Sequence, residues 1–179
     1  TSSRNRKISL LVEYFSSTPD PDRGYALAAL TGSLNFKNIK AAFFKELIKE
    51  KQDEYLFDLS YDYVGDLAET ISLLWNQKKE GNMPSLPALL DSLTKTKNED
   101  LKGKVIDILD ISTVDQRWAF IKLFTGGLRI GVSSRLVKQA LATYGNVDLE
   151  EIEKIWHGLH LPYIDLFSWL EKKGAKPKV

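Results

Sequence analysis

The sequence predicts an all-α fold, a compact multi-helix domain of two weakly repeated helical lobes. Apolar residues recur at helical spacing along nearly the whole chain, and polar or glycine-containing loops of about two to eight residues separate these segments. No alternating strand with a hairpin turn is found; residues 55–59 come nearest and suit a helix equally well. The 179 residues, 43% of them hydrophobic, suffice for one domain or two small lobes.

Amphipathic spacing predicts the helices of the first half of the chain. The apolar residues of the first one follow the i, i+3, i+4, i+7 pattern of a buried helix face: Ile8, Leu11, Val12 and Phe15. The next predicted helix stops near Gly32, because glycine commonly follows a helix end. That helix covers residues 26–30, and further helices are predicted over residues 39–48, 67–75, 86–93 and 105–109.

End signals place the helices of the second half. Thr113 with Gln116 fits a capping box, and the helix that they open stops at Gly126-Gly127. Ser133 or Ser134 begins the next helix, since serine is a preferred N-cap residue. The predicted helices of this half cover residues 112–124, 133–145, 149–156 and 163–170. Asp148 is the predicted N-cap of the third of these.

Composition excludes several classes of protein. The absence of cysteine rules out disulfides and thiolate metal sites and favours a cytosolic setting. No apolar run reaches the roughly 18 residues that span a bilayer, so no membrane association is expected. The chain begins without Met and ends in the lysine-rich segment 172–179. We therefore expect a part of a longer protein, with a helical domain over residues 1–173 and the start of a linker at 174–179.

Charge is unevenly distributed although the net charge is only +1. No acidic residue lies between Asp115 and Asp148, and none precedes Glu13. The basic residues in these two stretches are Arg4, Arg6, Lys7, Arg117, Lys122, Arg129, Arg135 and Lys138. A phosphate-binding surface and an ordinary solvated face with local salt bridges both fit this pattern.

The segment Gly126–Arg135 combines three properties that suit an anion. Its glycines allow close backbone approach, a helix begins at Ser133 or Ser134 with free N–H groups, and two arginines flank the turn. A helix–helix corner with a Gly C-cap and a Ser N-cap is the alternative interpretation. A weaker version of the same pattern surrounds Gly65 and Asp66, which suggests two related lobes that grip one partner.

The stretch 120–133, Phe-Ile-Lys-Leu-Phe-Thr-Gly-Gly-Leu-Arg-Ile-Gly-Val-Ser, resembles the signature of the N-terminal DNA-binding domain of ATP-dependent DNA ligases. Three further segments resemble a bacterial subgroup of these ligases: residues 14–27, residues 59–70 and residues 153–159. The resemblance covers essentially the whole chain. It implies sequence-independent binding of nicked duplex DNA through backbone phosphates, in a bacterial cytoplasmic enzyme that seals nicks in replication, repair or recombination.

The resemblance also implies partners, cofactors and site residues. A nucleotidyltransferase domain and an OB-fold domain follow in such ligases, which use ATP and Mg²⁺; this chain itself is expected to need no cofactor and to be a monomer. Together with the corner chemistry it predicts DNA contacts at Tyr63, Gly65, Gly127, Arg129, Gly131, Ser133, Ser134, Arg135 and Lys138. A helical protein-interaction scaffold without nucleic-acid affinity is the alternative function.

No catalytic residue is predicted in the chain. The ligase nucleophile is the lysine of a Lys-x-Asp-Gly motif, and the nearest match, Lys51-Gln52-Asp53-Glu54, fails at the glycine. We expect the chain alone to be inactive. His157 and His160 lack a third metal ligand, and the four tryptophans are expected in the core.

Overall fold

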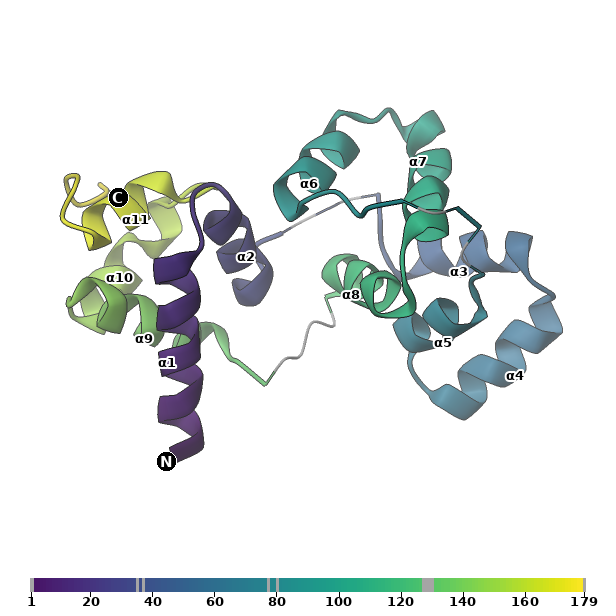
Figure 1. Cartoon of the computed structure of the whole chain (residues 1–179), viewed down its shortest axis with the longest axis horizontal. Helices are drawn as coiled ribbons and strands as arrows, with labels where there is room; N and C mark the ends of the chain where they lie inside the picture. Colours follow the sequence, from purple (N-terminus) through teal and green to yellow (C-terminus); the bar gives the residue numbers. More distant parts are fainter. Residues whose placement is uncertain are drawn as a thin grey trace. The chain divides into compact units, whose positions relative to one another are not determined.

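The computed structural model describes residues 2–34, 36, 38–76, 78–79, 81–126 and 131–178. Within these residues it contains eleven α-helices, one 3₁₀ turn and no strand, which confirms the predicted all-α class (Figure 1). The chain divides into two units. Unit 1 comprises residues 1–33 and 129–179, and unit 2 comprises residues 34–128, so unit 2 is inserted between the two parts of unit 1.

Unit 1 is built around α9. Its elements are α1 (Ser2–Ser17), α2 (Asp22–Thr31), α9 (Ser134–Gly145), α10 (Leu149–Ile155), the 3₁₀ turn η1 (Trp156–Gly158) and α11 (Ile164–Leu170). Helices α1, α2, α10 and α11 all pack against α9. The buried apolar side chains include Phe15, Leu27, Leu141 and Phe167. Burying such side chains supplies most of the stability of a helical unit of this size.

A partly buried ionic cluster fixes the ends of α9 and α11. The guanidinium of Arg23 donates to both carboxylate oxygens of Asp20 at 2.8 Å, donates to Glu171 and lies 4.2 Å from the ring centre of Phe167. The Tyr144 hydroxyl donates to the same Glu171 carboxylate at 2.7 Å. Hydrogen bonds from Arg23, Lys173 and Tyr144 hold the pKa of Glu171 at about 2. The cluster therefore joins the α1–α2 loop, α9 and α11 into one rigid unit.

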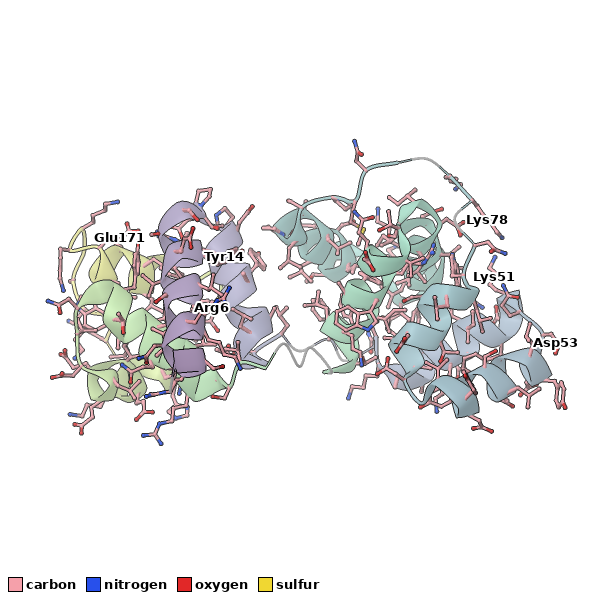
Figure 2. All side chains as sticks on the ribbon, turned by 60° about the horizontal axis from the view of Figure 1, so that its bottom comes forward. Arg6, Tyr14, Lys51, Asp53, Lys78 and Glu171 are labelled. Atoms are coloured by element: carbon pink, nitrogen blue, oxygen red, sulfur yellow. The ribbon has the colours of Figure 1, made fainter. Side chains whose placement is uncertain are left out.

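Unit 2 has its own core. Its helices are α3 (Ala41–Lys51), α4 (Glu54–Val64), α5 (Leu67–Leu74), α6 (Leu86–Lys95), α7 (Asn98–Ile111) and α8 (Val114–Thr125). The fully buried side chains include Phe44, Phe57, Ile71, Leu109 and Ile121. The ambiguous segment 55–59 belongs to α4, which begins after the N-cap Asp53, labelled in Figure 2.

Most local end signals are confirmed. Thr113 and Gln116 form the predicted capping box, and Ser133 caps α9 by accepting a hydrogen bond from the Leu136 N–H. Gly32 and Gly126 end α2 and α8 with left-handed backbone at φ 70° and 74°. Asp148 stands at the N-cap of α10 without a side-chain cap bond. These signals succeed because a cap involves only residues within one turn of each other.

The expectation that all four tryptophans lie in the core is wrong. Trp75 is buried and donates to Asp110 at 2.9 Å, but Trp156 and Trp169 are only half-buried and Trp118 is 36% exposed. Helix α8 is apolar on several sides, and its buried face contains Arg117, Phe120 and Ile121. Trp118 follows Val114 by one turn, and both side chains are exposed.

The two Gly-containing corners occupy different places relative to the two units. The Gly65 corner joins α4 to α5 within unit 2. The second corner is different, because α8 belongs to unit 2 and α9 to unit 1. The segment 126–133 therefore contains the passage between units, not a helical hairpin inside one lobe.

Candidate nucleic-acid interface

Helices α1 and α9 start at the same end of unit 1. Near their starts, the Lys7 Nζ donates to the Gly131 carbonyl oxygen at 2.7 Å. Near their ends, one Arg23 nitrogen donates both to the Phe15 carbonyl oxygen at 3.1 Å and to the Tyr144 hydroxyl at 3.3 Å. These contacts indicate that the two packed helices run in the same general direction; in Figure 1, α9 lies largely behind α1. Their N-termini, each with a partial positive charge, lie at one end of unit 1.

The start of α9 presents backbone donors that have no partner within the helix, beside a neutral cap. The Ser133 hydroxyl accepts the Leu136 N–H at 3.2 Å, and the first backbone bond of the helix runs from the Val137 N–H to the Ser133 carbonyl. The N–H groups of Ser134 and Arg135 precede these bonds, and both residues are exposed. Because the cap is a hydroxyl, the capping side chain brings no negative charge to the start of the helix.

Two features of the structure favour glycine at position 131. Its φ of 70° lies in the left-handed region, where a side chain is unfavourable. A Cβ there would also approach the Lys7 Nζ to 3.3 Å, closer than ordinary contact. The glycine therefore allows the backbone to turn into α9 while its carbonyl holds the Lys7 ammonium close to the helix start.

Cations gather at this end without acids among them. Arg4, Lys7, Arg135 and Lys138 lie in pairs three residues apart on α1 and α9, so each pair shares a helix face. Arg6 adds another exposed guanidinium on α1, labelled in Figure 2. Neither α9 nor α1 as far as Val12 contains an acidic residue. Two helix N-termini and five cations make this end of unit 1 strongly positive, whereas the whole chain is nearly neutral.

Lys138 is partly engaged within unit 1. Its Nζ lies 4.6 Å from the ring centre of Trp156, and the side chain is half-buried. The contact holds the ammonium one turn beyond Arg135 without neutralising it, because an aromatic face attracts a cation but contributes no negative charge.

The Gly65 corner in unit 2 differs in its charge. Gly65 has the same left-handed backbone, at φ 73°, but the cap of α5 is Asp66, whose carboxylate accepts the Glu69 N–H at 2.9 Å and pairs with Lys122. Partial burial works to raise the Asp66 pKa, but the Lys122 bond and the backbone N–H groups outweigh it and lower that pKa. A carboxylate already occupies the anion position here, and Lys122 already has a partner.

Two cations of the acid-free stretch already have bonding partners inside unit 2. Lys122 pairs with Asp66. Arg117 is only 3% exposed, and its Nη1 donates to the carbonyl oxygens of Leu109 and Ser112 at the end of α7. Burial lowers the Arg117 pKa, against a smaller opposing effect of Asp110. A run of basic residues in the sequence thus separates into structural cations in unit 2 and exposed ones in unit 1.

The predicted contact residues fall into three groups. Gly131, Ser133, Ser134, Arg135 and Lys138 lie together at the start of α9. Tyr63 and Gly65 lie in unit 2, at the end of α4. Gly127 and Arg129 lie outside the described residues. Sequence reasoning missed the contact of Lys7 with Gly131, since nothing local signals a bond between residues 124 positions apart.

Other chemistries find little support in the described part of the chain. His157 and His160 are exposed, and no group of three potential metal-binding side chains is found among the described residues. None of the helices described is both long and apolar enough to cross a membrane.

Unit 1 thus has the features of an anion-binding helical domain: paired helix N-termini, a neutral cap and cations that form no ion pair with any described residue. The family model of the DNA ligase N terminus matches residues 1–142, about four-fifths of the chain. The chain belongs to this family, the N-terminal domain of ATP-dependent DNA ligases. The match includes α1 and most of α9, and hence the positive end of unit 1. No curated protein matches the chain.

Proposed function

We propose that the chain binds nicked duplex DNA without sequence preference, as the DNA-binding domain of a ligase that seals nicks. The observation that supports this most directly is the positive end of unit 1, where Lys7, Gly131 and the start of α9 adjoin. Free backbone N–H groups, hydroxyls and cations are the groups that bind phosphate oxygens in protein–DNA complexes. None of them distinguishes one base from another.

The proposed contacts differ in their support. Ser133, Ser134, Arg135 and Lys138 are supported by their common position and by the absence of acidic residues from α9 itself. Tyr63 and Gly65 have less support, because Asp66 and Asp62 lie beside them and repel phosphate. Arg129 is proposed on its sequence position within the family signature alone.

Titration of fluorescent nicked duplexes tests the proposal. Two duplexes of unrelated sequence should bind with similar affinity, and the affinity should fall steeply between about 50 and 200 mM salt as counterions are released. Absence of binding at low salt would favour the alternative, a protein-interaction scaffold. Affinity for only one sequence would indicate base readout instead.

The proposal assigns DNA binding to this chain and the chemical steps to other domains of a longer ligase. We place the adenylylated lysine, ATP and Mg²⁺ in nucleotidyltransferase and OB-fold domains outside this chain, since no Lys-x-Asp-Gly occurs in the 179 residues. Incubation with ATP labelled in its α-phosphate and Mg²⁺ should leave the chain unlabelled. A covalent adenylyl group on any lysine would overturn this assignment.

A further inference from the structure

Helix α4 in unit 2 exposes an unusual number of large apolar side chains. Tyr55 is 74% exposed, Leu56 48%, Leu59 51% and Tyr63 93%. Tyr55, Leu59 and Tyr63 follow one another at intervals of four residues, so they form one stripe, and Leu56 lies beside it. Single exposed apolar residues are ordinary, but a contiguous group on one helix face marks a contact surface.

The stripe does not arise from a failure to form a core. Phe57, on the opposite side of α4, is fully buried and stacks on Tyr61 with ring centres 5.8 Å apart. The Asp53 cap and the left-handed Gly65 define both ends of the helix. Helix α4 is thus firmly placed against α5 and α3 by one face, and the apolar stripe occupies the face that remains.

Acidic side chains border the stripe. Glu54, Asp58 and Asp62 also recur every four residues, in the row next to the apolar one, and α4 contains no basic residue. Glu54 pairs with Lys49 from α3. Among the residues that the structure describes, Asp58 and Asp62 form no ion pair. The face therefore combines four exposed apolar side chains with two carboxylates that form no close ion pair, although Lys49 is near enough to Asp58 to attract it.

This charge decides between possible occupants. Phosphates of DNA and anionic lipid head groups are repelled by Asp58 and Asp62, whereas lysine or arginine side chains are attracted. We propose that the α4 face docks a protein segment with apolar side chains bordered by lysine or arginine. The apolar stripe would supply the affinity, and the acidic row would set the register and the choice of partner. This inference concerns unit 2 and does not depend on the proposed DNA contacts at the start of α9, but it assigns Tyr63 to a protein segment in place of the less supported DNA contact.

Selection from a random peptide library displayed on phage tests the proposal with the full chain as bait. The enriched peptides should combine lysine or arginine with aromatic or aliphatic residues. A synthetic copy of the strongest peptide, measured by fluorescence anisotropy, should lose roughly ten-fold or more in affinity for the double variant Tyr55→Gln, Leu59→Gln. It should lose roughly two- to five-fold per carboxylate for Asp58→Asn and Asp62→Asn, and less so at high salt.

Matched controls separate docking from unfolding. Ile164→Gln and Glu153→Gln remove an exposed apolar and an exposed acidic side chain in unit 1, and both should leave peptide affinity unchanged. All variants should keep the helical circular dichroism of the parent chain, because the substituted side chains are exposed. The proposal would be overturned if the Tyr55→Gln, Leu59→Gln variant bound the peptide as tightly as the parent chain, or if the selection enriched acidic peptides.

Three further measurements decide against other occupants. Sedimentation would show concentration-dependent association lost in the Tyr55, Leu59 variant if a second copy of the chain were the occupant. If a lipid surface were the occupant, vesicles of anionic phospholipid would retain the parent chain but not the Tyr55, Leu59 variant. A fall in duplex affinity in this variant would assign the face to DNA. Each of these results would overturn the assignment to a basic protein segment.

Discussion

Replacing Arg135 with alanine should reduce both the affinity for duplex DNA and the dependence of that affinity on salt. Arg135 is exposed in the first turn of α9, beside the Lys7–Gly131 contact. Its guanidinium forms no ion pair with any described residue. Loss of the side chain therefore removes one phosphate contact without leaving a buried partner unpaired.

The number of cations at the positive end of unit 1 sets the expected salt dependence of DNA binding. Its cations are Arg4, Arg6, Lys7, Arg135 and Lys138. If each neutralises one phosphate, the slope of log affinity against log salt is about −4.5, from about 0.9 for each contact. Affinity should then fall about 500-fold between about 50 and 200 mM salt. Without Arg135 the slope becomes about −3.6, and the fall about 150-fold.

Fluorescence anisotropy on a nicked duplex, repeated at several salt concentrations, measures both slopes. Lys104→Ala is the control, because Lys104 is an exposed cation on α7 in unit 2. The reasoning fails if Arg135→Ala leaves the slope unchanged, or if Lys104→Ala lowers it equally. The first result would place DNA elsewhere, and the second would show attraction by net charge alone.

Three further predictions concern the geometry that holds the site. Gly131→Ala should weaken duplex binding more than the control Gly32→Ala. Both substitutions strain the backbone at a φ of 70°, but a Cβ at position 32 meets no atom within 4 Å. Equal affinities of the two variants in the same titration would refute a role for the Lys7 contact. Ser133→Ala should destabilise the chain by about 1 kcal/mol and Ser133→Gly by only a few tenths, since glycine is tolerated at an N-cap; urea unfolding distinguishes the two, and equal losses would contradict the cap. Glu171→Gln should cost up to about 3 kcal/mol at pH 7, because lowering the Glu171 pKa from 4.5 to about 2 favours the folded state by that order. This stabilisation is complete above about pH 4.5 and disappears as the pH falls toward 2, so the variant and the parent should converge in urea unfolding at low pH, and an undiminished difference at pH 2 would disprove it.

The two glycine corners show why a shared pattern does not give a shared site. Gly65 and Gly131 have nearly the same φ, and each precedes a capped helix. At Gly65 the cap is a carboxylate that already has a cation, whereas Ser133 leaves the helix start neutral and open. The difference in cap chemistry is visible in the sequence, but the pairing of Asp66 with Lys122 is not, because the two residues are 56 positions apart.

The basic stretch 116–147 illustrates the limit of charge patterns in the same way. Linear spacing places Arg117 and Arg135 in one acid-free run. Packing buries Arg117 against the end of α7 in unit 2 and leaves Arg135 exposed in unit 1. Trp118 and Trp75 likewise look alike as members of apolar helices, but only the second is buried.

The sequence by itself determined the all-α class, the helix ends that depend on local caps, and membership of the DNA ligase N-terminal family. These follow from periodicity and from interactions within a single turn, which a linear pattern records. Only the tertiary structure decided that unit 2 interrupts unit 1, that Lys7 joins Gly131, and that α4 leaves an apolar face uncovered. Such features depend on which distant segments pack together, and the free energy of that packing is distributed over many side chains that no local pattern identifies.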